Sequence, residues 1–165
     1  MSKNLPFNLE DSLFSLLQSN TQTALQSILD LNPSTKKFGV SLTKEESLLL
    51  LNARASSLKE QERIEFGEGI LAKLIFSFCD SPYIYQDNYV DTLERLQDIF
   101  YLYKNECMDE LTDDELVAFI KTNFNGICQG SLDYLEDTCL EGFAREIRSG
   151  TRRFIGLYTE DDDEY

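Results

Sequence analysis

The sequence predicts an all-α protein, a compact bundle of about six helices. Apolar residues recur at helical spacing along most of the chain, and strands do not alternate with helices. The 3 prolines and 8 glycines among 165 residues leave little material for long loops. A chain of this length most naturally forms one domain, which we expect over 1–158, followed by an acidic, disordered tail over 159–165.

Polar capping residues and apolar stripes mark the individual helices. Thr43 with Glu46 and Thr112 with Glu115 match the capping box, in which each side chain accepts a hydrogen bond from the other residue's backbone N–H. The stretch "ILAKLIFSFC" is apolar nearly all round, which is typical of a buried central helix. In order, the expected helices cover 8–18, 21–31, 44–60, 70–79, 87–105, 113–124 and 131–148.

Two of these helices have apolar faces that can be read from the spacing. In the helix over 44–60 the expected buried face consists of Leu48, Leu51, Ala55 and Leu58. In the helix over 87–105 it consists of Tyr89, Leu93, Leu96, Phe100 and Tyr103.

One stretch departs from the helical pattern. A proline and a glycine interrupt the periodicity in "LNPSTKKFGVSLT", and Phe38, Val40 and Leu42 alternate with other residues as they do in a β-strand. Near the C-terminus "RRFIGLY" has the composition of a second short strand. We therefore allow one short strand pair, 38–42 with 153–158, beside the helices.

Charge and composition exclude several classes of function. The formal net charge is −15, from 30 acidic and 15 basic residues. An acidic surface repels phosphate groups, so direct binding to nucleic acid or to an anionic membrane is disfavoured, whereas a protein partner with a basic surface would be attracted. The N-terminal sequence lacks the pattern of a signal peptide, and the longest apolar region is too short to span a membrane. We expect a cytoplasmic protein with reduced cysteines.

The absence of histidine from the sequence excludes further types of catalytic and metal site. It excludes Ser–His and Cys–His catalysis, as well as zinc sites built from cysteine and histidine. The 4 cysteines also lack C-x-x-C spacing. A thiol activated by a helix N-terminus or an arginine stays open, and Cys128 in "GICQGS" is the best placed for it, although an ordinary, partly buried thiol is the competing interpretation. We expect no metal and no cofactor.

A pattern of dinucleotide-binding proteins occurs once. Gly67, Gly69 and Ala72 in "RIEFGEGILAK" satisfy G-x-G-x-x-A. The preceding stretch carries Arg63 and Glu65, and no second parallel strand is expected downstream, so the phosphates of a dinucleotide would have no crevice. We interpret the two glycines as residues that let the chain turn and pack closely at the start of a helix.

Paired carboxylates are plentiful, and they are the residues that magnesium sites and glycosidases use. The pairs are Glu65 with Glu68, Glu94 with Asp98, and the run 113–115. None follows a calcium-binding loop pattern, and a helix would expose each of them to solvent, so we expect an ordinary solvated surface.

Several short sequence motifs carry a resemblance to known proteins. They include "FGVSLT", "RIEFGEGIL", "LTDDEL" and "CQGSLDYL", within the run from about Phe38 to Ile147. On these phrases the chain resembles an uncharacterised family of small cytoplasmic proteins from clostridia and related Gram-positive bacteria. The resemblance implies a bacterial, cytosolic, mainly helical domain of unknown function, and it implies no catalytic residue.

Two regions are candidates for binding a partner. In "CDSPYIYQDNY", Tyr83 and Tyr85 lie in a connection between two helices and Tyr89 follows, so this stretch is either a structural corner or an exposed aromatic patch. The second region is a basic cluster before the acidic tail, formed by Arg145, Arg148, Arg152 and Arg153. Arginines there either offset a helix dipole or bind an anion or a partner.

Together these observations favour a non-enzymatic, cytoplasmic protein-interaction or regulatory module of otherwise unknown function. One alternative is an acidic inhibitor that imitates nucleic acid and occupies the basic site of a DNA- or RNA-binding protein. A second alternative is an enzyme with a carboxylate- or cysteine-based pocket, against which the missing catalytic constellation weighs. The sequence leaves open which partner is bound and what the oligomeric state is.

Overall fold

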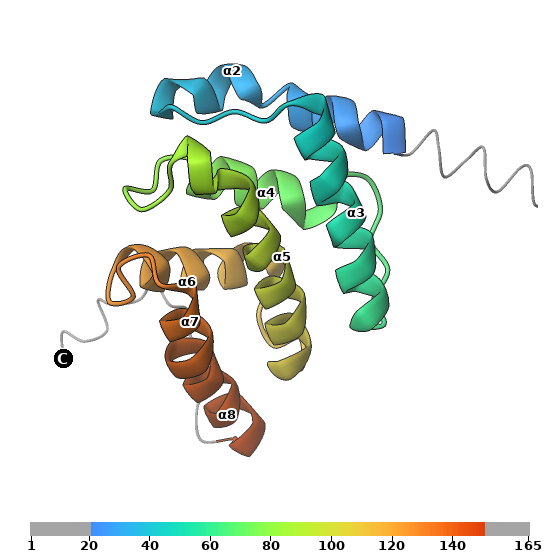
Figure 1. The fold of residues 1–165 in the computed structure, drawn as a ribbon. Helices are drawn as coiled ribbons and strands as arrows, with labels where there is room; N and C mark the ends of the chain where they lie inside the picture. Colours follow the sequence, from blue (N-terminus) through green and yellow to red (C-terminus); the bar gives the residue numbers. More distant parts are fainter. Residues whose placement is uncertain (1–20, 151–165) are drawn as a thin grey trace, which may run out of the picture.

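Helix α5 (Tyr89–Glu106) lies at the centre of the fold and contacts four other helices (Figure 1). These are α3 (Lys44–Glu60), α4 (Gly69–Phe78), α6 (Asp113–Asn125) and α8 (Glu141–Ser149). The prediction of an all-α bundle is confirmed for the part of the chain that the structure describes.

The structure is a computed structural model and describes residues 21–150. A helix over 21–29 precedes the short helix α2 (Asn32–Thr35), where the sequence predicted one helix over 21–31. The predicted helix over 8–18 and the predicted acidic tail over 159–165 lie outside the described residues.

The buried face of α5 is the one that helical spacing predicted. Its tyrosines and apolar residues at that face are all buried: Tyr89, Leu93, Leu96, Phe100 and Tyr103. Helix α4, which its composition predicted to be buried nearly all round, is buried on one face only, since Phe76 is exposed. Within residues 21–150, no helix carries an apolar stretch long enough to cross a membrane.

Both predicted capping boxes are present and set the starts of α3 and α6. The Thr43 hydroxyl accepts a hydrogen bond from the Glu46 backbone N–H at 3.0 Å, and the Glu46 carboxylate accepts one from the Thr43 N–H at 2.9 Å. Thr112 and Glu115 make the equivalent pair at 3.1 and 2.8 Å. The two helices therefore begin at the residues that the sequence indicated, Lys44 and Asp113.

Residues 38–42 do not form the expected strand. Phe38 ends a 3-10 helix, and the extended segment after it is bound by side chains instead of a second strand. The Asn32 amide binds the backbone N–H and C=O of Leu42 at 2.9 and 2.8 Å, and the Gln86 amide binds those of Ser41 at 2.8 and 3.0 Å. These amides satisfy backbone groups that a neighbouring strand would otherwise bind. The proposed partner strand, 153–158, lies outside the described residues.

The last predicted helix is continuous but irregular. Helix α7 (Leu132–Tyr134) passes into a π-helical segment, Leu135–Leu140, which leads directly into α8. A π-turn spans one residue more than an α-turn, so the buried position that follows Leu135 is Leu140. Cys139, which helical spacing placed on the buried stripe, is only half-buried.

We expect the protein to lose stability as the pH rises above about 9. Burial raises the pKa of the Cys107 thiol from 9.0 to about 11, and burial also raises the pKa of the Tyr89 hydroxyl above its usual 10.0. The unfolded chain therefore loses these protons at a lower pH than the folded chain, which favours unfolding by about 1.4 kcal/mol per pH unit for each group within its window.

Urea unfolding between pH 8 and pH 11 measures this dependence. Tyr89→Phe removes one titrating hydroxyl from the core, so its stability should fall less steeply above pH 10 than that of the wild type. Parallel curves for the two proteins over this range would contradict the assignment.

Candidate functional site

The connection between α3 and α4, residues 61–68, is anchored to the core by an ion pair between a buried guanidinium and a half-buried carboxylate. Arg54 on α3 donates from Nε to Glu65 Oε1 at 2.8 Å and from Nη1 to the Gly67 carbonyl at 2.7 Å. The Tyr101 hydroxyl of α5 donates to the same Glu65 oxygen. Arg54 and Tyr101 are both buried. Glu65 was expected on a solvated helix face, and this expectation is wrong, because its carboxylate faces inward from the loop.

The same interactions decide which face of α3 is buried. The predicted face was right in part: Leu51 and Leu58 are buried, but Ala55 is exposed and Leu48 is only half-buried. The residues of α3 that are buried are Ser47, Leu50, Leu51, Arg54, Ser57 and Leu58. A run of four leucines, 48–51, offers apolar residues to either face, so spacing alone does not choose between them.

A second set of hydrogen bonds fixes the start of this loop. The Arg63 side chain donates to the side-chain amide oxygen Oδ1 of Asn105 and, at 3.0 Å, to the Asp109 carboxylate. The Asn105 amide donates in turn to the Gln61 backbone carbonyl at 3.0 Å, and the Arg63 N–H donates to the Leu58 carbonyl at 2.9 Å. The loop is therefore held at both of its ends by groups of α3 and α5.

The anchored residues of the loop alternate with two large apolar side chains that face solvent. Arg63, Glu65 and Gly67 make the inward contacts, whereas Ile64 and Phe66 between them are 84% and 82% exposed. Apolar side chains of this size that are exposed together are typical of an interaction surface. We call residues 61–68, with these two side chains, the display loop.

Gly69 is required by the close approach of the ion pair. Its φ is +58°, and a Cβ at this position would lie 1.9 Å from Glu65 Oε1 and 2.9 Å from Arg54 Nε. Gly67 also has a positive φ, +66°, but a Cβ there would meet nothing within 4 Å. The G-x-G-x-x-A pattern is thus explained by a turn and a close contact, as expected. Among the described residues no strand precedes it.

Negative charge surrounds the display loop. Glu60, Glu62 and Glu68 form no ion pair with any basic side chain of residues 21–150, whereas Glu65 is paired with Arg54 and Arg63 is paired with Asp109. The two exposed apolar side chains are therefore flanked by three carboxylates that remain available to a partner.

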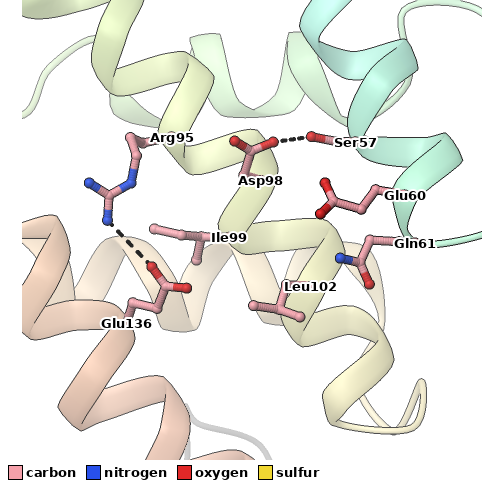
Figure 2. A pocket seen from close by; sticks show the side chains of 8 residues that line it. All are labelled: Ser57, Glu60, Gln61, Arg95, Asp98, Ile99, Leu102 and Glu136. Carbon is pink, nitrogen blue, oxygen red and sulfur yellow. Dashed lines mark hydrogen bonds and ion pairs between the residues drawn. The ribbon is translucent and has the colours of Figure 1, made fainter.

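A polar groove of about 270 Å³ adjoins the display loop at Gln61 (Figure 2). The groove lies between the end of α3, the middle of α5 and the π-helical segment. Its lining residues are Ser57, Glu60, Gln61, Arg95, Asp98, Ile99, Leu102 and Glu136. Ser57 donates a hydrogen bond to Asp98, and Arg95 binds Glu136 at 3.3 Å.

The groove is suited to a cationic side chain better than to catalysis. Three carboxylates, those of Glu60, Asp98 and Glu136, face one guanidinium, that of Arg95, and the side chains of Ile99 and Leu102 add apolar surface. Such a lining suits the aliphatic stem and charged end of lysine or arginine. Within residues 21–150 no group of three or more acidic or cysteine side chains could hold a metal ion.

The predicted tyrosine patch is not brought together by the fold. Tyr85 is 61% exposed, whereas Tyr83 is half-buried and packs edge-on against Phe124 with ring centroids 6.3 Å apart. Tyr89 is completely buried in the core and so presents no surface to a partner. Of the three, Tyr85 alone stays available as a binding residue.

The predicted basic cluster is partly neutralised. Arg148 binds Glu106 at 2.5 Å and Glu141 at 3.3 Å, and Arg145 lies 3.7 Å from the Glu141 carboxylate. Arg152 and Arg153 lie outside the described residues.

Cys128 is not an activated thiol. It is buried, and its Sγ lies 3.6 Å from that of Cys139. Burial, together with the hydrogen bond to Cys139, raises the pKa of the Cys128 thiol to about 12. An activated nucleophile requires the opposite shift.

The display loop was not predicted as a functional region. Its signal in the sequence is weak: two large apolar residues inside a charged, glycine-containing connection, outside any helical stripe. Their exposure depends on which side of the loop the ion pair holds inward, and the sequence does not show that contact.

Three glycine substitutions should distinguish the stability cost of the close contact at Gly69 from the stability cost of backbone strain. Gly69→Ala places a methyl group against the ion pair at a positive φ, and we expect it to lower the free energy of unfolding by about 3 kcal/mol. Gly67→Ala adds strain alone, which costs about 1 kcal/mol. Gly142→Ala, in α8 with open space around it, should stabilise the protein by about 0.5 kcal/mol. Urea unfolding measures all three, and equal effects of the first two would contradict the role of the ion pair.

Comparison with known proteins identifies the chain at the level of a family. Neither the curated proteins nor the solved structures contain a match to it. A family model does match, and it covers residues 27–153, which include all the helices from α2 to α8. The chain belongs to this family, DUF6323, a family of unknown function.

Proposed function

We propose that this protein is a non-enzymatic interaction module and that the display loop is its principal contact surface. The observation that supports the proposal is the exposure of Ile64 and Phe66 on a loop that Arg54, Tyr101 and Asn105 hold in place. Binding of a flexible loop is opposed by the entropy lost on ordering it. A loop that is already fixed by buried groups loses little of that entropy on binding.

The apolar residues provide the attraction. Transfer of a large apolar side chain from water into a well-packed pocket contributes about 1.5 to 3 kcal/mol. Ile64 and Phe66 are two residues apart, so a partner with a single apolar cleft can bury both of them. A few such residues commonly supply most of the affinity of an interface.

The charges around the loop predict which charge borders the binding pocket of the partner. Glu60, Glu62 and Glu68 flank the apolar side chains, and the adjoining groove also carries an excess of carboxylates. A complementary partner is a protein with an apolar pocket bordered by lysine or arginine residues, one of which reaches the groove. The net charge of −15 adds long-range attraction to such a surface. We propose the bacterial cytoplasm as the compartment, because the cysteines are all free and the sequence resembles a bacterial cytoplasmic family.

The partner can be captured through the display loop itself. A photo-crosslinking amino acid at position 66 should attach to the partner, which mass spectrometry then identifies. With that partner purified, Ile64→Ser combined with Phe66→Ser should weaken binding at least tenfold in calorimetry while changing the free energy of unfolding by less than about 0.5 kcal/mol.

The matched control is Phe76→Ser on α4, which removes another exposed aromatic ring, 67% accessible, away from the loop. It should bind like the wild type. Equal losses for the control and the loop variant, or no loss for either, would refute the display loop as the contact surface.

The charge of the rim gives a separate prediction. The affinity should fall as salt rises, because exposed charge pairs are screened beyond about 8 Å at physiological ionic strength. Glu62→Gln should slow association and flatten this dependence, whereas Asp87→Asn, which removes an exposed carboxylate outside the groove and the display loop, should change both much less. Stopped-flow association rates at several salt concentrations measure the effect. Indistinguishable rates for the two variants would contradict a basic rim.

A further inference from the structure

Two thiols approach each other at the end of the molecule formed by α6 and the last helix. Cys128 Sγ and Cys139 Sγ lie 3.6 Å apart, and neither is part of a disulfide. Cys128 belongs to the turn after α6, and Cys139 belongs to the π-helical segment. All four cysteines are within the described residues, and this is the one sulfur–sulfur contact among them.

Two irregularities of the backbone create this contact. The π-turn moves Leu140 into the core and leaves Cys139 half-buried at the edge of it. On the other side, the Cys128 N–H donates to the Asn123 carbonyl at 3.0 Å and the Gly130 N–H donates to the Phe124 carbonyl at 2.8 Å, which fixes the turn. π-Turns inside α-helices frequently accompany functional residues.

We propose that Cys128 and Cys139 form a dithiol site that a small-molecule disulfide oxidises to an intramolecular disulfide. The Cys139 thiolate attacks one sulfur of the oxidant, forms a mixed disulfide and releases the first small thiolate. Cys128, whose Sγ lies 3.6 Å away, then gives its proton to the first released thiolate as it attacks Cys139 Sγ and displaces the second. The protons of the two cysteines pass to the two released thiolates, so the protein loses two electrons and the oxidant becomes two thiols.

The order of the steps follows from exposure. Cys139 is half-buried and can be reached by the oxidant, whereas Cys128 is buried and can be reached only by its neighbour. Closure moves the sulfurs from 3.6 Å to the bonded distance of about 2.05 Å, a shift that side-chain rotation and a small movement of the turn can supply.

The disulfide would join the turn after α6 to the last helix. Gly130, two residues beyond Cys128, packs against Tyr83, and a Cβ at Gly130 would lie 2.6 Å from that of Tyr83. Oxidation would therefore restrain the turn that supports the corner carrying Tyr85, which is a different surface from the display loop.

The test uses the full chain incubated with oxidised glutathione and then alkylated with N-ethylmaleimide. We expect two fewer maleimide additions than in the reduced protein. Trypsin leaves both cysteines in one peptide, 122–145, so an added cut after Glu136 is needed. The two fragments should then separate only after reduction, and linkage to Cys79 or Cys107, or full alkylation of all four thiols, would overturn the proposal.

Serine variants test the order of the steps. Cys128→Ser should stop at the mixed disulfide of Cys139 with glutathione, and Cys139→Ser should leave Cys128 unmodified. Cys79→Ser is the control, because Cys79 donates to the Phe76 carbonyl and has no sulfur neighbour, and it should form the disulfide like the wild type. Modification of Cys128 in the Cys139→Ser protein would overturn the order of the steps. If a variant fails to fold, the peptide test on the wild type still decides whether the disulfide forms.

Discussion

The ion pair between the buried Arg54 and the half-buried Glu65 is the interaction on which the position of the display loop depends. It turns the Arg54 side of α3 toward α5, where the Tyr101 hydroxyl binds the same carboxylate. It also holds the loop after α3 against the core and leaves no room for a side chain at Gly69. A buried charge without its partner is strongly unfavourable, so the loop has one position in which both charges are satisfied.

That single position explains how a charged, solvent-facing loop can present apolar side chains. The fold does not bury Ile64 and Phe66, because the residues that alternate with them take the inward positions. Their exposure is maintained by the energy of the ion pair and of the Arg63 contacts with α5. In the proposed interaction, the carboxylates around the loop favour a partner with a basic rim over one with an acidic rim.

The parts of the fold that were predictable are those governed by local interactions. The capping boxes at Thr43 and Thr112 and the buried stripe of α5 could be recognised because all the residues concerned lie within a few turns of one another. The strand prediction for 38–42 failed because Asn32 and Gln86 bind the extended backbone, and a side chain 45 residues away leaves no periodic signal.

The sequence by itself determined the fold class, the helix starts, the acidic charge and the exclusion of histidine chemistry. Only the tertiary structure decided which face of α3 is buried, where the π-turn lies and which aromatic residues are exposed. It buried Tyr89, left Tyr85 exposed, and exposed Ile64 and Phe66 on the display loop. The physical reason is that a buried charge is strongly unfavourable without a partner. The stable conformation of the loops and turns is therefore the one that brings opposite charges together.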